Sequence, residues 1–231
     1  MSKRGPWLRK QVGLYEVLSL AAMLALTGSS SARAEGGRSS LGARLRSTLS
    51  FDVSGGGATS LFGGATDPGR GSLEVALHAR LPLLVRSGLQ LDYTAGVVPV
   101  ALAFGTRVSD AGLPDGTLRK ETVFGAGVDG LGFVAHLGRS DRWQPYVSAV
   151  GGVRLFERPV PDPRGIRFNF SADLGAGVAL RVGTAHRVAL GVVLHHLSNG
   201  GLGSANPSFN GFDITVSVGR WFDRGSRRGP S

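Results

Sequence analysis

The chain has no cysteine, no long apolar run and no sustained helical periodicity. The absence of cysteine among its 231 residues excludes a disulfide scaffold and a cysteine-ligated metal site. The formal net charge is +10, yet no basic run is interleaved with aromatic residues, so nucleic acid is a poor partner for this chain. An anionic membrane surface or a phosphorylated glycolipid suits the charge better, although a generally arginine-rich composition explains it equally well.

The apolar run near the N-terminus, Val17–Leu26, is about half as long as the roughly 20 residues that cross a bilayer as a helix. It follows a basic segment and precedes Ala32-Arg33-Ala34, which predicts a secretory signal peptide over residues 1–34 in preference to a membrane anchor. Cleavage would lower the formal net charge from +10 to about +6. We expect one β-barrel domain over residues 35–222 and a polar C-terminal tail over residues 223–231.

Apolar residues recur with a period of two from Leu41 onward, which predicts β-strands. In the clearest segment, apolar residues such as Phe168 share one face and polar residues such as Asp173 share the other. Two of the predicted strands shift phase once, near Pro99 and near Asp129-Gly130, which predicts a bulge or bend at each place. The predicted strands are Leu41–Val53, Leu73–Leu83, Leu89–Phe104, Glu121–Leu137, Gln144–Phe156, Arg167–Val182, Arg187–Ser198 and Phe212–Phe222.

The lengths of these strands and of their connections indicate a membrane barrel. Many strands reach the roughly 9–11 residues that a tilted strand needs to cross a bilayer. Long connections alternate with short ones, as extracellular loops alternate with periplasmic turns in outer-membrane barrels. The predicted fold is all-β, an eight-stranded antiparallel transmembrane outer-membrane β-barrel; the alternative is a soluble barrel with its apolar faces turned inward. The connections expected to be long are 55–71, 105–120, 157–166 and 199–211, and those expected to be short are 85–88, 138–143 and 183–186.

The predicted interior is polar and filled. Eight strands leave room only for side chains, so we expect ion pairs and hydrogen bonds inside and no pore. The segment Gly125–Gly130 matches G-x-G-x-x-G but lies inside a predicted strand, so its glycines indicate room for packing and not a dinucleotide site. The residues expected to face inward include Arg44, Arg46, Asp52, Glu74, His78, Arg80, Asp92, Asp173 and Arg181.

The stretch 'HHLSNGGLGSANPSFNG', His195–Gly211, gathers polar side chains at the end of the seventh predicted strand. The period of two places His196 and Ser198 on the lipid-facing side and His195 inside. Residues i and i+2 on one strand face are close enough for an imidazole nitrogen to reach a serine oxygen, as in a base that activates a nucleophile. The alternative is that both side chains lie in the headgroup region, where polar groups cost little free energy, and have no catalytic role.

Part of this stretch, 'HLSNGGLGSANPSFN', resembles the His-x-Ser-Asn-(Ala/Gly)-Gly…Asn-Pro signature of the lipid A 3-O-deacylase family. The resemblance implies an outer-membrane barrel that hydrolyses the ester-linked acyl chain at the 3-position of lipid A. Further segments are similar to that family in the same order, so the resemblance covers most of the chain after residue 34. These segments are 'LDYTAGVVPVAL', 'VFGAGVDGLGF', 'QPYVSAVGGVRLFERPVP' and 'RFNFSADLGAGVAL'.

Carried over by position, the resemblance implies catalytic roles at the strand end. Ser198 would be the nucleophile and His196 the general base. Gly201, through its backbone N–H, and Asn206 would contribute to an oxyanion hole, with Asn199 as a further positioning residue. One oxyanion-hole donor is worth on the order of 10²–10³ in rate.

One position departs from the family pattern. The family commonly has Glu or Asp, the acid that orients the histidine, where this chain has Asn210. By alternation Asn210 shares the outward face of His196 and Ser198, so the geometry is kept while the charge is lost. An amide oxygen holds an imidazole N–H but stabilises the imidazolium less than a carboxylate does. Asp213 is the nearest other acid, although alternation turns it inward.

The resemblance implies no metal and no organic cofactor, and it implies lipid A or lipopolysaccharide in the outer leaflet as the partner of the chain in the outer membrane. Two alternatives stay open at this point. One is a non-catalytic outer-membrane barrel with a structural or ligand-binding role, which the loss of the acid at Asn210 favours. The other is an esterase that acts on a different lipid ester, such as a phospholipid. Whether two copies form a homodimer is also open.

Overall fold

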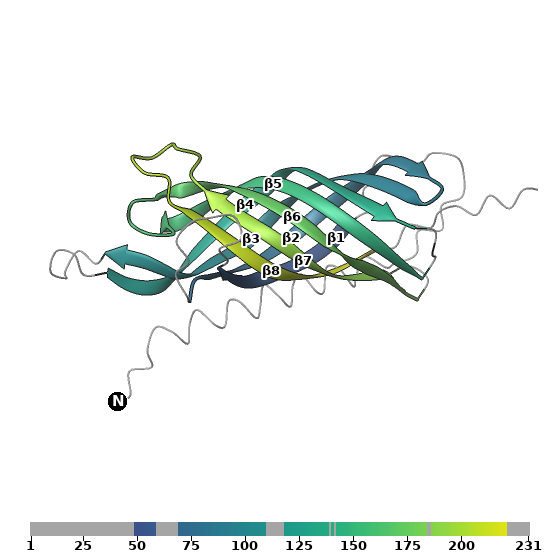
Figure 1. Ribbon diagram of the computed structural model, residues 1–231, viewed down its shortest axis with the longest axis horizontal. Coiled ribbons are helices and arrows are strands. Elements are labelled where there is room, and N and C mark those ends of the chain that lie inside the picture. Colours follow the sequence, from purple (N-terminus) through teal and green to yellow (C-terminus); the bar gives the residue numbers. More distant parts are fainter. Residues whose placement is uncertain are drawn as a thin grey trace, which may run out of the picture. The chain divides into compact units, whose positions relative to one another are not determined.

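The structure is a computed structural model that describes residues 49–58, 69–109, 118–138, 140, 142–183 and 186–220. The predicted signal peptide, the predicted tail and the first part of the first predicted strand lie outside the described residues. Within them, eight strands form a closed antiparallel barrel in which each strand pairs with its neighbours in the chain and β8 pairs with β1 (Figure 1). The strands are β1 (Leu49–Ala58), β2 (Gly71–Arg86), β3 (Leu89–Ser109), β4 (Leu118–Leu137), β5 (Trp143–Val160), β6 (Ile166–Val182), β7 (His186–Ser198) and β8 (Ser208–Arg220).

The order and number of the predicted strands are confirmed, but several strands extend beyond the predicted ends. β5 continues to Val160, which pairs with Ile166 at the start of β6, so the connection there is 161–165 and the prediction of a long loop over 157–166 was wrong. Burial of the apolar side chains of Phe156 and Val160 explains the extension. Both side chains pack inside the barrel, and this burial stabilises the chain between them as part of the strand. No helix of the described part of the chain is long and apolar enough to cross a membrane.

Closure of the barrel between β1 and β8 leaves none of these eight strands as an open edge. The two strands pair from Ser50 opposite Gly219 to Ala58 opposite Gly211. In hydrocarbon, each unpaired backbone N–H or C=O group costs about several kcal/mol of free energy. The closed sheet satisfies these groups between strands, which a membrane-spanning sheet requires.

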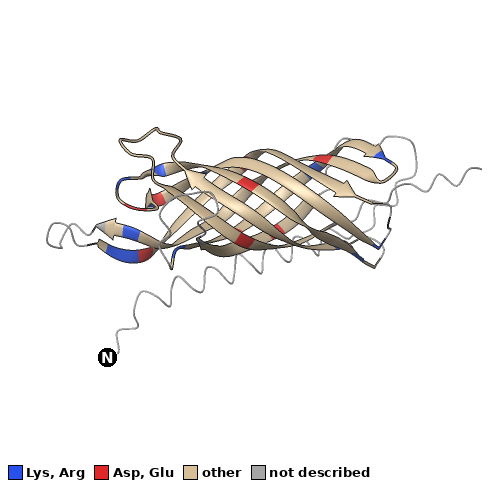
Figure 2. Cartoon of the chain, viewed as in Figure 1, with Lys and Arg blue, Asp and Glu red and all other residues tan. Residues whose placement is uncertain are grey.

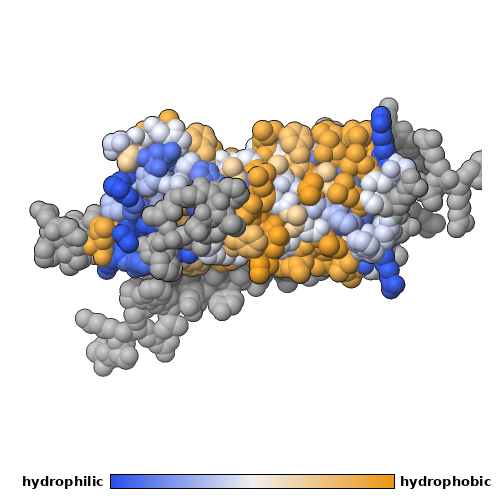
Figure 3. Space-filling model, viewed as in Figure 1, coloured by the Kyte–Doolittle hydropathy of each residue, from blue (hydrophilic) through white to orange (hydrophobic). Residues whose placement is uncertain are grey.

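The outward face of the barrel is apolar, as the alternation of residues predicts. Leu174, Leu190 and Ile214, from three adjacent strands, are each about 60% exposed. An apolar band crosses the visible face of the barrel, with hydrophilic residues beyond it at both ends (Figure 3). Most Lys and Arg residues in view also lie toward the two ends (Figure 2). This exposure is opposite to that of a soluble barrel, so the soluble alternative is rejected.

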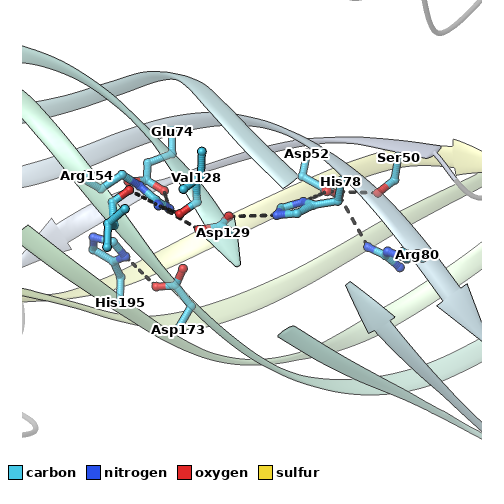
Figure 4. A network of polar contacts seen from close by, with 11 residues as sticks. Ser50, Asp52, Glu74, His78, Arg80, Val128, Asp129, Arg154, Asp173 and His195 are labelled. Atoms are coloured by element: carbon cyan, nitrogen blue, oxygen red, sulfur yellow. Dashed lines mark hydrogen bonds and ion pairs between the residues drawn. The ribbon is translucent and has the colours of Figure 1, made fainter. Parts of the chain in front are cut away.

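The interior holds the predicted polar network, centred on Arg154. This residue is 1% exposed, and its guanidinium donates to both oxygens of Glu74 and to Asp129 Oδ1, each over 2.8 Å. The network continues from Asp129 through His78 to Asp52 (Figure 4). Interior contacts of the remaining predicted residues are Arg80 with Asp52, Asp92 with Gln90 and His136, and Asp173 with His195.

Two members of the predicted inward set, Arg44 and Arg46, lie outside the described residues. Arg181, at the far end of β6, donates through Nε to the carbonyl of Gly183. The prediction of a polar interior was incomplete, because an apolar cluster fills part of the barrel near the ends of β5, β7 and β8 that carry the connections 161–165 and 199–207. This cluster consists of Ala76, Val98, Ala101, Val108, Val123, Phe156, Val160, Leu197 and Phe209.

Both predicted irregularities are confirmed in the pairing register. The register between β3 and β4 shifts between Val98 and Ala101, on either side of Pro99. The register between β4 and β5 shifts between Asp129 and Leu131, which leaves Gly130 as the extra residue. Asp129 and Gly132 are consequently both buried, so the alternation changes phase there.

The G-x-G-x-x-G match is confirmed as a packing feature of β4. A Cβ on Gly125 would lie 2.5 Å from Phe156 Cδ1, and a Cβ on Gly127 would lie 2.6 Å from Arg154 Cδ. These glycines therefore make room for a ring of the apolar cluster and for the central guanidinium of the network.

We expect Arg154→Met to destabilise the barrel by about 3–5 kcal/mol, because Glu74 and Asp129 would be left as buried, unpaired charges. The measurement is denaturant unfolding of the barrel refolded in lipid vesicles, followed by the gel shift between folded and heat-unfolded protein. Arg158→Met on the same strand is the matched control, since that side chain is 43% exposed and should contribute no more than about 1 kcal/mol. Equal stability of the two variants would contradict the assignment of Arg154 as the centre of the network.

Candidate active site

The candidate site lies where β7 ends and β8 begins. In the register between these strands, His196 is opposite Asn210 and Ser198 is opposite Ser208. On the other side, β6 places Phe170 next to Ser198. The loop 199–207 joins the two strands directly next to the site. Three adjacent strands and one loop therefore fix the positions of the predicted residues.

Ser198, His196 and Asn210 form one line of hydrogen bonds on the outward face. His196 Nδ1 lies 2.6 Å from Asn210 Oδ1, and His196 Nε2 lies 3.1 Å from Ser198 Oγ. Because an amide oxygen only accepts hydrogen bonds, the imidazole must donate through Nδ1. Nε2 is then left with a lone pair that accepts the hydroxyl proton of Ser198, which is the tautomer a general base needs.

The line of hydrogen bonds lies at the border of the apolar wall. His196 is exposed, whereas Ser198 is 9% exposed. One step further along β7 and β8, Leu194 pairs with Phe212 on the same outward face. The acyl chains of a lipid beside the barrel would thus contact the apolar side chains of the wall. The polar part of the same lipid would contact the polar residues of the candidate site.

Asn199 organises the loop that follows Ser198. Its side chain is fully buried; Oδ1 accepts from the Gly201 N–H over 2.9 Å and Nδ2 donates to the carbonyl of Ala205 over 2.7 Å. Its backbone N–H donates to Asn206 Oδ1 over 3.1 Å, and its carbonyl accepts from the Leu202 N–H. These contacts fit the expectation that Asn199 is a positioning residue, and they place Asn206, the oxyanion-hole candidate, against Asn199; both roles stay predictions.

The N–H of Gly201 is engaged in this structure. It donates to Asn199 Oδ1, so an oxyanion at this position would have to take over that hydrogen bond. Gly200 and Gly201 both adopt positive φ, +63° and +80°, a region that favours glycine. The tight turn that they make is a direct consequence of the two consecutive glycines.

Asp213 does not replace the acid missing at position 210. It is 1% exposed and faces the interior, where both carboxylate oxygens accept from the Ser72 hydroxyl. The barrel wall separates it from His196, which points outward. Asn210 is therefore the residue that contacts His196 Nδ1 in this structure.

One interior cluster has the residue types of a metal site. Ligand atoms of Glu74, Asp173 and His195 lie within 4.8 Å of one another in the described part of the chain. However, Arg154 binds both oxygens of Glu74, and His195 Nδ1 pairs with Asp173 Oδ1 over 2.6 Å. The protein's own cations thus balance these carboxylates, and we assign the cluster to the interior network (Figure 4).

Fold and site together define a membrane-spanning β-barrel that carries a hydrolase-like arrangement of side chains on its lipid-facing wall. A family model described as lipid A 3-O-deacylase (PagL) matches residues 101–219, which include the second half of β3 from residue 101, all of β4 to β7, β8 except Arg220, and the whole candidate site. The chain belongs to the lipid A 3-O-deacylase family. This membership confirms the predicted outer-membrane location and the predicted class of carboxylic ester hydrolase.

One solved structure has the same fold, and a second is less similar. The crystal structure of the outer membrane enzyme PagL superposes with a TM-score of 0.51 at 14% sequence identity, covering 73% of this chain and 97% of that one. The solid-state NMR structure of the outer membrane protein AlkL in lipid bilayers has a TM-score of 0.34 at 17% identity and covers 75% of this chain and 86% of that one. A comparison with curated proteins gives no significant match.

Sequence reasoning missed the residues of neighbouring strands that flank Ser198. Phe170 on β6 and Ser208 on β8 lie on either side of Ser198, and Phe170 forms an edge-on ring contact with Phe168. Alternation gives the face of each residue but not the register between strands, so no signal within β7 itself could identify them.

Proposed function

We propose that the chain removes the 3-O-linked acyl chain of lipid A with Ser198 as the nucleophile, His196 as the general base and Asn210 as the residue that orients the imidazole. The observation that carries this proposal is the continuous hydrogen-bonded line from Ser198 Oγ through both ring nitrogens of His196 to Asn210 Oδ1. Membership of the family supplies the reaction and the substrate class.

In the first half of the reaction, Ser198 Oγ attacks the ester carbonyl carbon while His196 Nε2 takes the hydroxyl proton. The tetrahedral oxyanion collapses, the bond to the 3-oxygen of the glucosamine breaks, and the imidazolium returns its proton to that oxygen. The acyl chain is then esterified to Ser198. Asn210 holds the ring through the Nδ1–H, so Nε2 stays directed at the serine in both proton transfers.

In the second half, water attacks the acyl-serine carbonyl while His196 accepts its proton. Collapse of the second tetrahedral intermediate releases the fatty acid and restores the Ser198 hydroxyl. The oxyanion of each intermediate would be stabilised by the loop that Asn199 organises, through the N–H of Gly201 or the amide of Asn206.

The position of the site suits a substrate that stays in the membrane. Ester-linked chains of lipid A lie in the outer leaflet next to the sugar, and the site lies at the border between apolar wall and loops. We infer that the end of the barrel carrying the loop 199–207 is extracellular. Ser198, His196 and Asn210 come from one chain, so the proposed line of hydrogen bonds forms without a second copy.

A serine-directed fluorophosphonate with a long alkyl chain tests the nucleophile directly. Ser198 Oγ should displace the fluoride, and the adduct should be found on Ser198 within the tryptic peptide 188–220, where fragment ions separate it from Ser204, Ser208 and Ser217. The His196→Gln variant is the control, because without the base the hydroxyl should not react. An adduct on another serine, or equal labelling of the variant, would contradict the proposed roles.

A further inference from the structure

The loop 199–207 leans away from the barrel axis. In Figure 1 it projects beyond the outline of the barrel wall at the junction of β7 and β8. The barrel axis crosses the bilayer, so a loop that leans sideways overhangs the lipid next to the wall. That lipid lies directly beside Ser198.

Leu202 is the large apolar residue of this loop and is 64% exposed, a higher fraction than that of any other exposed large apolar residue in the described part of the chain. Its position is held by the hydrogen bond of its N–H to the carbonyl of Asn199, whose side chain is itself fully bonded within the loop. The backbone at Leu202 is thus held in place, while its apolar side chain is exposed close to the lipid-facing wall.

The loop is continuous with the lipid-facing wall at its base. A Cβ on Gly200 would lie 2.8 Å from Phe170 Cε2, so the backbone of the loop rests directly on this ring. Phe170 is 42% exposed on the outward face of β6. The apolar surface that contacts lipid therefore extends from β6 across Gly200 to the loop.

We propose that Leu202 inserts among the acyl chains of a lipid A molecule in the outer leaflet and holds this glycolipid against the wall with its 3-linked ester at Ser198. The inference rests on the proposed function for the identity of the lipid. Insertion itself depends only on the exposure of Leu202 and on the continuity of the apolar surface.

Site-specific fluorescence tests insertion separately from activity. Because the chain has no cysteine, Leu202→Cys carries a single thiol for a bimane label, and Ser204→Cys in the same loop is the matched control. In vesicles of phospholipid and lipid A, nitroxide-labelled lipid should quench the probe at position 202 more than the probe at 204, and aqueous iodide should quench it less. Equal quenching at both positions would overturn the inference even if the enzyme is fully active.

Kinetics test the consequence for the substrate. Leu202→Ser should raise KM for lipid A about tenfold, the effect of losing part of the burial of one leucine side chain, with kcat and the hydrolysis of a short water-soluble ester unchanged. Leu202→Met should restore the wild-type KM. Leu118→Ser is the control, since Leu118 is also exposed but lies on β4.

An unchanged KM in Leu202→Ser would overturn the positioning role of this residue while leaving Ser198 as the nucleophile. If the wild type itself released no acyl chain from lipid A, the proposed function would fail, and the quenching pattern at position 202 would still decide whether the loop enters the membrane.

Discussion

Ser198→Ala should abolish the release of 3-linked acyl chains from lipid A, with a loss in rate of about 10⁴-fold or more. The variant lacks the oxygen that forms the acyl-enzyme, while the hydrogen bond between His196 and Asn210 remains. The barrel should fold normally, because Ser198 lies on the outward face and takes no part in the interior network. Mass spectrometry of lipid A from cells that express each protein measures the effect.

Ser208→Ala is the matched control for this experiment. Ser208 lies opposite Ser198 on the neighbouring strand, so the same substitution removes a hydroxyl from the same patch of the wall without touching the proposed nucleophile. Lipid A should be deacylated as in the wild type. Deacylation by a folded Ser198→Ala protein would show that another group attacks the ester, and the proposed mechanism would have to be abandoned.

Asn210→Asp should raise the rate of deacylation by about 10²-fold and at most about 10⁴-fold, the effect of a carboxylate at this position in serine proteases. Aspartate has the same shape as asparagine, so an oxygen can stay 2.6 Å from His196 Nδ1 while a full negative charge stabilises the imidazolium of the transition state. The measurement is kcat for lipid A in mixed micelles at a pH at which the new carboxylate is ionised.

Two controls are needed to interpret the rate of the Asn210→Asp variant. Asn210-Gly211 is a sequence prone to deamidation, so the intact mass of the wild type must first show that position 210 is still an amide. Asn210→Leu should lower the rate, because the imidazole loses the acceptor that fixes its tautomer. If the Asp variant is no faster than the wild type, orientation of His196 does not limit the reaction.

The alternation of residues was sufficient to predict the fold, because the fold depends on which face of each strand is apolar. Asp173 was placed inside and Phe168 outside from this pattern alone. The pattern did not predict which face of the strand Asp129 occupies, because Asp129 lies at the predicted shift of phase, where a bulge can leave the side chain on either face. Its partner Arg154 was missed with it, and the centre of the interior network emerged only from the three-dimensional arrangement.

The candidate site was predictable to different degrees. His196 and Ser198 lie two residues apart on one strand, so their contact follows from local geometry. The contact of His196 with Asn210 depends on the register between β7 and β8, and alternation supplied the face of Asn210 but not its distance from the ring. The engagement of the Gly201 N–H by Asn199 was beyond prediction, because it depends on the conformation of an irregular loop.

The filled interior of the barrel has a further consequence for the kinetics of this enzyme. With ion pairs and apolar side chains occupying the inside, neither glycolipid nor fatty acid passes through the barrel, and both reach or leave Ser198 by lateral diffusion. The encounter is therefore two-dimensional. The relevant substrate concentration is the mole fraction of lipid A in the surface around the protein, and added phospholipid or detergent slows the reaction by surface dilution even when the bulk amount of lipid A is unchanged.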